Sequence, residues 1–383
     1  MLASRTLEVV NPALDVLRPT VVEVNRARLA ANFRAIQQAV APAAVMPILK
    51  ANAYGHGLIE VARHLVALGA GSLGVAFLEE AVTLREHGIT VPILVMGGIL
   101  GNQIPLFLRH GLTLTASSID KLRQIDDAAR EVGVTAKVHL KIDTGMERIG
   151  VHYYNAHGLL ERAADCRQTI VEGVYSHFAN ADAADLGSAR LQLARFLEVL
   201  QWYDKHGMTP PLRHIANSGA ILQLRESHLD LVRPGILLYG VYPSAEVRHT
   251  IVVQPALSWK SRVVYFKVVT PGHPVSYGST WQSDHNVRVV TVPVGYGDGY
   301  FRALSNVAQV IIRGKKYPVV GRVCMDQIMV NIEGDSAYNG DEVVLLGADG
   351  DQVITCEDLA AWAGTIPYEV LTNINTRVPR VYV

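Results

Sequence analysis

The most informative stretch of the chain is Pro47-Ile48-Leu49-Lys50-Ala51-Asn52-Ala53-Tyr54-Gly55-His56-Gly57, in which a short apolar run ends on a lysine and then turns through two glycines. Lys50 stands where a buried strand would end. An amine in that position is partly removed from water, which lowers its pKa and makes a neutral amine available for a Schiff base with a carbonyl compound. A surface lysine just beyond a core strand would have the same local sequence, so the rest of the chain must decide between the two interpretations.

Short apolar runs of the buried-strand type recur along the chain and alternate with amphipathic segments at helical spacing. The eight runs are 45–49, 73–77, 93–96, 112–115, 138–142, 171–175, 212–215 and 229–232. The segments between them include 58–69, 78–87, 120–133 and 190–206. Eight such strands, each followed by a helix, predict a (β/α)8 barrel of the TIM type, whereas an open doubly wound sheet more often has fewer strands.

The pattern changes beyond Gly240, where short β-branched segments follow one another between Gly, Asp and Asn turns. The expected strands are 255–265, 287–294, 309–312, 316–323, 328–332 and 342–346, and only 356–362 is expected to be helical. We therefore expect two domains. Residues 1–250 would form the barrel, with an amino-terminal extension over 1–17 and an opening strand at 20–24, and residues 251–383 would form a mainly β domain.

Composition excludes several classes of protein. The 35 basic and 35 acidic side chains balance, so nothing favours a nucleic acid as a partner. Cys166, Cys324 and Cys356 are far apart, and they indicate neither a disulfide framework nor a zinc site, so no metal is expected. No segment resembles a signal peptide, and no run of about 18 apolar residues suggests a membrane span. We expect a cytoplasmic protein that does not bind membranes.

Barrel enzymes carry their chemistry at the carboxyl ends of the strands, so the residues that follow each run are considered together. They are Lys50, Tyr54, Lys141, Asp143, Arg148, His177, Asn217, Ser218, Arg233, Gly235 and Ile236. The loops after strands seven and eight bind phosphate in many barrels, and here a serine hydroxyl and glycine amides would make an anion cradle. A phosphate in that cradle and an amine at Lys50 together suggest pyridoxal phosphate, although each residue alone could be structural.

Eight motifs extend this set across both expected domains. They are Lys50-Ala51-Asn52-Ala53-Tyr54-Gly55-His56-Gly57, Lys141-Ile142-Asp143-Thr144-Gly145-Met146-Glu147-Arg148-Ile149-Gly150, Tyr175-Ser176-His177-Phe178, Ala216-Asn217-Ser218, Val232-Arg233-Pro234-Gly235, Val275-Ser276-Tyr277-Gly278, Gly295-Tyr296-Gly297-Asp298-Gly299 and Gly321-Arg322-Val323-Cys324-Met325-Asp326-Gln327. In this order they resemble the alanine racemase family, fold-type III pyridoxal-phosphate enzymes, over nearly the whole chain.

The resemblance implies a role for each matching position. Lys50 would hold pyridoxal 5'-phosphate covalently, and Arg233 would face the pyridine nitrogen. Arg148 would steady the ring's phenolic oxygen and the substrate carboxylate, and Met325 would also contact substrate. The remaining cofactor-binding positions are Tyr54, His177, Asn217, Ser218, Gly235, Ile236 and Tyr368. Lys141 matches a lysine that is carbamylated in many members to position the arginine corresponding to Arg148.

The chemistry of racemisation supports these assignments. The α-proton leaves one face of the substrate and returns to the other, so two acid/base groups on opposite sides suffice. The resemblance makes these groups Lys50 and Tyr277. A tyrosine can act as a base only where positive charge lowers its high pKa, which Arg233 could help to supply through His177. Because a guanidinium only donates hydrogen bonds, Arg233 would leave the ring nitrogen unprotonated and suppress transamination.

The expected function is therefore interconversion of L- and D-alanine, supplying D-alanine for peptidoglycan. The resemblance also implies a homodimer in which Lys50 of one chain and Tyr277 of the other share each active site. A broad-specificity or serine racemase of the same fold is an alternative. A basic amino-acid decarboxylase is less consistent with Arg233, because those enzymes favour an acidic partner for the pyridine nitrogen. A non-catalytic pyridoxal-phosphate carrier would not need the β domain.

Overall fold

The computed structural model describes residues 17–383, and these divide into two units. The barrel unit runs from Asn25 to Ala256, and the β unit joins the described residues up to Val24 to Leu257–Val383. The boundary between Ala256 and Leu257 lies close to the domain boundary expected after residue 250. The amino-terminal extension, apart from Leu17, lies outside the described residues.

The opening strand belongs to the β unit, whereas the sequence pattern placed it in the barrel domain. β1 (Val21–Val24) pairs antiparallel with β11 (Leu257–Arg262) and parallel with β21 (Arg380–Tyr382). Val22 and Val24 are fully buried. The hydrogen-bond partners of a strand, which its own sequence does not specify, therefore decide the unit to which these residues belong.

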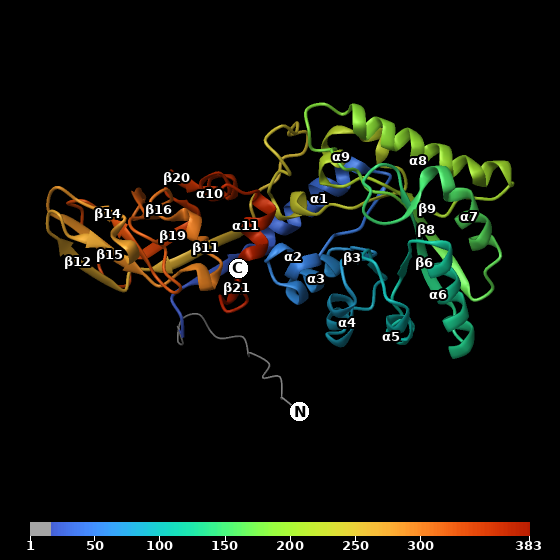
Figure 1. Ribbon diagram of the computed structural model, residues 1–383, viewed down its shortest axis with the longest axis horizontal. Helices are drawn as coiled ribbons and strands as arrows, with labels where there is room; N and C mark the ends of the chain where they lie inside the picture. Colours follow the sequence, from blue (N-terminus) through green and yellow to red (C-terminus); the bar gives the residue numbers. More distant parts are fainter. Residues whose placement is uncertain (1–16) are drawn as a thin grey trace. The chain divides into compact units, whose positions relative to one another are not determined.

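Strands and helices alternate along the barrel unit (Figure 1), and eight of the strands form the barrel that the alternating pattern predicts, while the two-residue strand β7 (Val151–His152) pairs in parallel with β6 in addition. The eight barrel strands are β2 (Ala44–Val45), β3 (Leu73–Val75), β4 (Ile93–Val95), β5 (Leu114–Ala116), β6 (Ala136–Asp143), β8 (Thr169–Tyr175), β9 (Leu212–His214) and β10 (Leu231–Val232). Single bridges from Ile48 to Gly74 and from Leu94 to Thr113 complete the pairing on one side. β10 pairs in parallel with β2, which closes the ring and confirms the (β/α)8 architecture.

The helices of the barrel unit, of which α1 precedes β2 and the others follow strands, bury apolar residues. They are α1 (Arg26–Val40), α3 (Leu58–Ala67), α4 (Leu78–Glu86), α5 (Ile104–Arg109), α6 (Ile119–Val132), α7 (Ala156–Ala164), α8 (Gly187–Lys205) and α9 (Ser218–Gln223). In α6 the Ser118 side chain accepts a hydrogen bond from the Lys121 N–H at 3.0 Å, and Gly133 ends the helix in a left-handed conformation. Leu122, Ile125 and Ala129 are buried at helical spacing.

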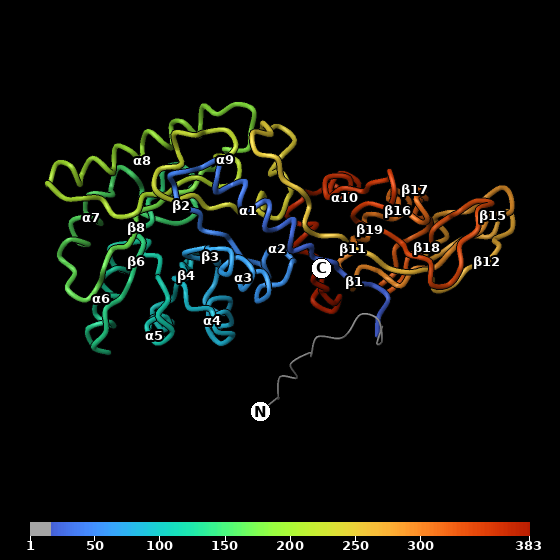
Figure 2. Tube along the Cα trace, turned by 180° about the vertical axis from the view of Figure 1, so that it is seen from behind, coloured from blue at the N-terminus to red at the C-terminus, as the bar shows by residue number. Residues whose placement is uncertain are grey.

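The β unit is built from two sheets and a hairpin (Figure 2). One sheet has the order β17-β16-β19-β11-β1-β21, with β20 paired to β19, and a second has the order β12-β15-β18. The remaining bounds are β12 (Tyr265–Val269), β13 (Pro274–Val275), β14 (Trp281–Gln282), β15 (Val287–Val292), β16 (Gln309–Ile312), β17 (Lys315–Pro318), β18 (Ile328–Asn331), β19 (Glu342–Asp349) and β20 (Gln352–Ile354). The mainly β character of this unit is confirmed.

Two helices lie in the β unit, where the sequence predicted one. The predicted helix is α10 (Cys356–Ala363), which Thr355 caps by accepting a hydrogen bond from the Asp358 N–H at 3.0 Å. The second is α11 (Pro367–Asn373). Pro367 suits a first helical turn because its fixed φ is already helical, but seven residues are too few to show a helical period. Among residues 17–383, no helix combines the length and apolar character that a bilayer crossing requires.

Candidate active site

Lys50 begins an unusual turn at the end of the barrel. α2 (Lys50–Tyr54) is a left-handed turn in which Ala51, Asn52, Ala53 and Tyr54 have φ values between 52° and 56°. Left-handed conformations cost L-residues roughly 1–2 kcal/mol each, so this turn must be stabilised by its surroundings. The Leu58 N–H donates to the Asn52 side chain at 2.8 Å, and the Gly57 N–H donates to the Asn52 carbonyl at 2.9 Å.

The Lys50 amine is suited to nucleophilic chemistry. Its side chain reaches solvent at the end of the barrel. Burial by neighbouring protein atoms lowers the pKa of the amine, and the Arg148 guanidinium lowers it further, whereas Glu80 raises it. The resulting pKa below the ordinary lysine value increases the fraction of neutral amine, which is the form that attacks a carbonyl group.

The loops after β9 and β10 bring together the residues predicted to make an anion cradle. The Ser218 hydroxyl accepts hydrogen bonds from the Gly235 N–H at 3.0 Å and from the Leu237 N–H at 3.4 Å, next to buried Ile236. A Cβ on Gly235 would lie 2.3 Å from the Tyr54 hydroxyl oxygen, so only glycine allows this approach. Asn217 caps α9 by accepting from the Ala220 N–H at 3.1 Å, which gives it a structural role as well.

These residues fit a bound phosphate. The Ser218 hydroxyl and the Tyr54 phenol lie around Gly235, a backbone position that a Cβ would obstruct, and none of Tyr54, Asn217, Ser218, Gly235 and Ile236 carries a negative charge. Hydroxyls and closely approachable amides are the donor set that a phosphate requires. The cradle and the Lys50 amine both belong to the barrel unit.

Arg233 is held rigidly inside the barrel. Its guanidinium donates to the Ser176 carbonyl at 2.7 Å, to His214 Nδ1 at 2.8 Å and to His177 Nδ1 at 3.2 Å. Burial lowers the pKa of Arg233 to about 10, so the group remains protonated at neutral pH. A guanidinium held in this way can donate to a ring nitrogen but cannot accept from one.

His139 and His214 extend this network and were not identified from the sequence. Because Arg233 donates to Nδ1 of His214, the proton of neutral His214 lies on Nε2, which faces His139 Nδ1 at 2.8 Å. Burial, assisted by the Arg233 charge, lowers the pKa of His139 to about 3 and that of His214 well below its usual value. Tyr175 stacks on His214 with ring centroids 4.9 Å apart. Alternation along β6 would place His139 on the same side as Lys141, which was the available sequence signal.

Lys141 is almost completely buried, and the charges of Arg233 and Arg148 act on its amine. Burial and then Arg233 lower the pKa of its amine to about 7, although Asp143 opposes the shift. Asp143 accepts from the N–H groups of Gly145 at 2.8 Å, Met146 at 3.0 Å and Arg148 at 3.2 Å. These bonds shape the turn that carries Arg148. An amine with a pKa near 7 is about half neutral at neutral pH, and the neutral form is chemically able to react with carbon dioxide.

His177 lies against Arg233, as expected for an orienting neighbour. Burial lowers its pKa well below the ordinary value, and Arg233 is the next largest cause. His177 is therefore neutral, with Nδ1 as the acceptor toward Arg233. The structure thus brings together Arg233, His177 and Lys141 within one buried cluster of the barrel unit.

Tyr277, Met325 and Tyr368 belong to the β unit. Tyr277 begins a 3-10 turn (Tyr277–Ser279), and its side chain is 72% exposed. The turn is fixed by Ser276, whose hydroxyl donates to the Arg322 carbonyl at 2.6 Å. Met325 is also exposed, and its carbonyl accepts from the Gly297 N–H at 2.9 Å, while Tyr368 lies on α11.

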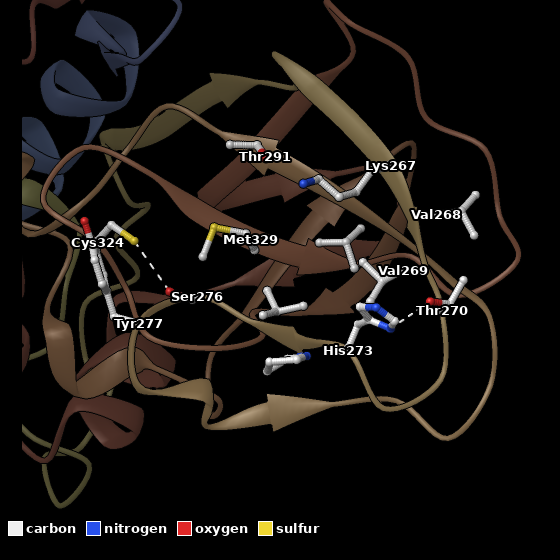
Figure 3. A pocket seen from close by; sticks show the side chains of 13 residues that line it. Lys267, Val268, Val269, Thr270, His273, Ser276, Tyr277, Thr291, Cys324 and Met329 are labelled. Atoms are coloured by element: carbon white, nitrogen blue, oxygen red, sulfur yellow. Dashed lines mark hydrogen bonds between the residues drawn. The ribbon is translucent and has the colours of Figure 1, made fainter.

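An open groove of about 550 Å³ runs through the β unit beside Tyr277 (Figure 3). Tyr277 and Cys324 lie at one end, and Thr270 and His273 at the other. The Ser276 hydroxyl approaches Cys324 Sγ at 3.5 Å. Tyr277 is therefore presented on a structured surface with free space beside it.

A (β/α)8 barrel with an amine of lowered pKa, a phosphate cradle and a fixed guanidinium, followed by a mainly β domain, defines a barrel-type pyridoxal-phosphate enzyme. Family models identify residues 24–243 as "Alanine racemase, N-terminal domain" and residues 256–382 as "Alanine racemase, C-terminal domain". The chain belongs to the alanine racemase family, whose cofactor is pyridoxal phosphate.

Individual relatives support this assignment over the full length. The chain is 45% identical over 369 residues to an alanine racemase of Carboxydothermus hydrogenoformans, covering 96% of this chain and 100% of the relative. It superposes on an alanine racemase of Clostridium difficile 630 with a TM-score of 0.91 and 36% identity, covering 96% and 97% of the two chains. A histidine racemase of Leuconostoc mesenteroides matches with a TM-score of 0.88 and 29% identity, covering 96% and 99%.

Proposed function

We propose that this chain is an alanine racemase, interconverting L- and D-alanine with pyridoxal phosphate. The observation that carries the proposal is the 45% identity with an alanine racemase whose entire length is matched. The same fold occurs in a histidine racemase at 29% identity, so the fold alone does not select the amino acid. The higher identity to alanine racemases favours alanine as the substrate.

Each residue of the barrel site has a task in this reaction. Lys50, Tyr54, Ser218 and Gly235 would hold the cofactor, which when bound supplies the electron sink that acidifies the substrate α-proton. Arg148 would hold the substrate carboxylate. Lys50 Nζ, as a neutral amine, would accept the α-proton from one face, and the Tyr277 hydroxyl would donate its own proton to the other face; the two groups exchange roles in the reverse direction. Arg233 keeps its protons, so it donates to the pyridine nitrogen without protonating it.

We further propose that the active site is shared in a homodimer. Tyr277 lies in a separate unit from Lys50, is largely exposed and borders an open groove, which suits it to meet a second chain. Two copies related by a two-fold axis would complete two identical sites. A cytoplasmic location and the supply of D-alanine to peptidoglycan belong to the same proposal. So does carbamylation of Lys141, which the pKa near 7 favours.

A racemisation assay over L-alanine, L-serine, L-histidine and L-lysine tests the substrate. We expect the highest kcat/KM for alanine and weak activity on serine, because an apolar wall discriminates by only about 1–3 kcal/mol per methylene. Histidine or lysine turned over as fast as alanine would contradict the proposal. Borohydride reduction and peptide mapping of the same sample should label Lys50, and a label on Lys141 would reject Lys50 as the cofactor lysine.

Complementation tests the shared site. Homodimers of Lys50→Ala and of Tyr277→Phe, each inactive, are unfolded, mixed and refolded. A shared site gives hybrids with one doubly altered site and one intact site, so activity should return. If Lys50 and Tyr277 act within one chain, every hybrid site keeps one substitution, and the mixture stays as inactive as its parents.

A further inference from the structure

Glu80 connects the Lys50 turn to a neighbouring helix. Its Oε1 accepts a hydrogen bond from the N–H of Ala51, the residue after Lys50, at 2.6 Å. Its Oε2 accepts from the N–H groups of Ala76 at 2.9 Å and Phe77 at 3.2 Å, where α4 begins. One carboxylate therefore joins the strained turn to the start of α4.

A carboxylate is required for this arrangement. Three N–H donors converge on two oxygens that can only accept. A glutamine at this position would offer one accepting oxygen and an NH2 group that would oppose either Ala51 or the amides of α4. Glu79, one position earlier in the same helical turn, is exposed, and its carboxylate has no hydrogen bond or ion pair among residues 17–383. The two adjacent glutamates thus carry the same charge, but within the described residues only the Glu80 carboxylate is hydrogen-bonded to the main chain.

Glu80 also acts electrostatically on Lys50. The groups that face the amine are Arg148, which lowers its pKa, Glu80, which raises it, and neutral His177. Tyr239 faces Glu80 from the barrel interior, and burial, with Tyr54 and Glu80, raises its pKa well above the usual value, so its phenol stays uncharged. Arg148 and Glu80 are therefore the opposing charges around Lys50. A lysine that both takes and returns a proton works best when neither form is strongly favoured.

We propose that Glu80 is a positioning residue for Lys50: its carboxylate fastens the left-handed turn that presents the amine and offsets the charge of Arg148. The inference rests on the proposed role of Lys50 as the reactive amine. It adds a residue on α4 to a barrel site whose predicted residues all come from the ends of the strands and the segments that follow them. Glu80 acts through the Ala51 amide and through its charge.

The test compares Glu80→Gln with the matched control Glu79→Gln in the full-length protein after cofactor removal. Acetic anhydride labels neutral amines, and peptide mass spectrometry measures labelling of Lys50 relative to the exposed Lys205 over a range of pH. In Glu80→Gln, the negative charge near Lys50 is removed. At pH values below the titration midpoint of Lys50, the amine should then be labelled about two- to five-fold faster than in the wild type, the factor expected for a partly exposed charge pair. Glu79→Gln should follow the wild type.

Cofactor binding provides the second readout. Glu80→Gln should bind pyridoxal phosphate on the order of ten-fold more weakly, because the turn loses a charge-assisted hydrogen bond. Glu80→Asp retains the charge but is one methylene shorter, so it should keep the wild-type labelling profile and still bind the cofactor weakly. It also serves as the second variant if Glu80→Gln does not fold.

Two results would overturn the inference. One is a Lys50 labelling profile in Glu80→Gln that superposes on the wild type, even with lowered thermal stability, since Glu80 would then only cap α4. The other is wild-type cofactor affinity in Glu80→Asp, which would remove the anchoring role. Both measurements differ from borohydride mapping, which tests Lys50 itself, so failure of the proposed function would be recognised separately.

Discussion

Replacing His139 with asparagine should make the stability of this protein less sensitive to acid. Asparagine places an oxygen near the position of Nδ1, so it can still accept from His214 Nε2, which lies 2.8 Å from Nδ1 in the structure. It does not titrate. The substitution therefore removes the buried histidine's proton equilibrium while keeping the hydrogen-bond acceptor, at a packing cost that does not depend on pH.

The sign follows from the two pKa values of His139. Its pKa is about 3 in the folded chain, because of burial first and Arg233 second, against 6.5 as the reference value. Between these values the unfolded chain binds a proton that the folded chain does not, so stability falls as pH decreases from about 6.5 to 3. At pH 5 the loss is about 2 kcal/mol, from roughly 1.4 kcal/mol per pH unit over about 1.5 units.

Urea unfolding at pH 8 and pH 5, at one protein concentration, measures this contribution. The free-energy difference between wild type and His139→Asn should shift by about 2 kcal/mol in favour of the variant at pH 5. His157→Asn, on the exposed surface of α7, is the comparison substitution. If the difference in unfolding free energy between wild type and His139→Asn stays constant between the two pH values, His139 is not held neutral in the folded chain. The donors and acceptors assigned to the Arg233 network would then be wrong.

Two further predictions concern the cofactor. Arg233→Glu should retain binding but slow racemisation and increase pyruvate and pyridoxamine phosphate, because a carboxyl group can stabilise a protonated ring nitrogen; product analysis that finds no increase would reject Arg233 as the ring partner. Gly235→Ala should weaken cofactor binding by about ten-fold or more, since its Cβ would lie 2.3 Å from the Tyr54 hydroxyl and overpacking costs about 1–3 kcal/mol. An unchanged affinity of Gly235→Ala for pyridoxal phosphate, measured by titration, would contradict the assignment of the phosphate to this cradle.

The sequence predicted the barrel well because buried parallel strands are continuous apolar runs. The same pattern located Arg233 directly after β10, whereas Lys50 lies five residues beyond Val45, where β2 ends, and not directly after a strand over 45–49. The pattern did not reveal the left-handed turn, since of Ala51, Asn52 and Ala53 only the asparagine is of a type enriched at positive φ. The contact between His139 and His214 depends on the register of strands far apart in sequence, which periodicity does not contain. Glu80 was missed because its partners are main-chain amides, which every residue possesses.

The pairing of β1 with β11 and β21 has a consequence for synthesis on the ribosome. The residues of β1 leave the ribosome before those of either partner strand, with the whole barrel unit between them in the chain. The barrel can fold as soon as it emerges, whereas β1 has no strand partner until β11 is translated and gains its second partner only with β21. Its apolar Val22 and Val24 are exposed to other nascent chains until β11 is translated, and the sheet that contains β1 is completed only when β21 has also been translated.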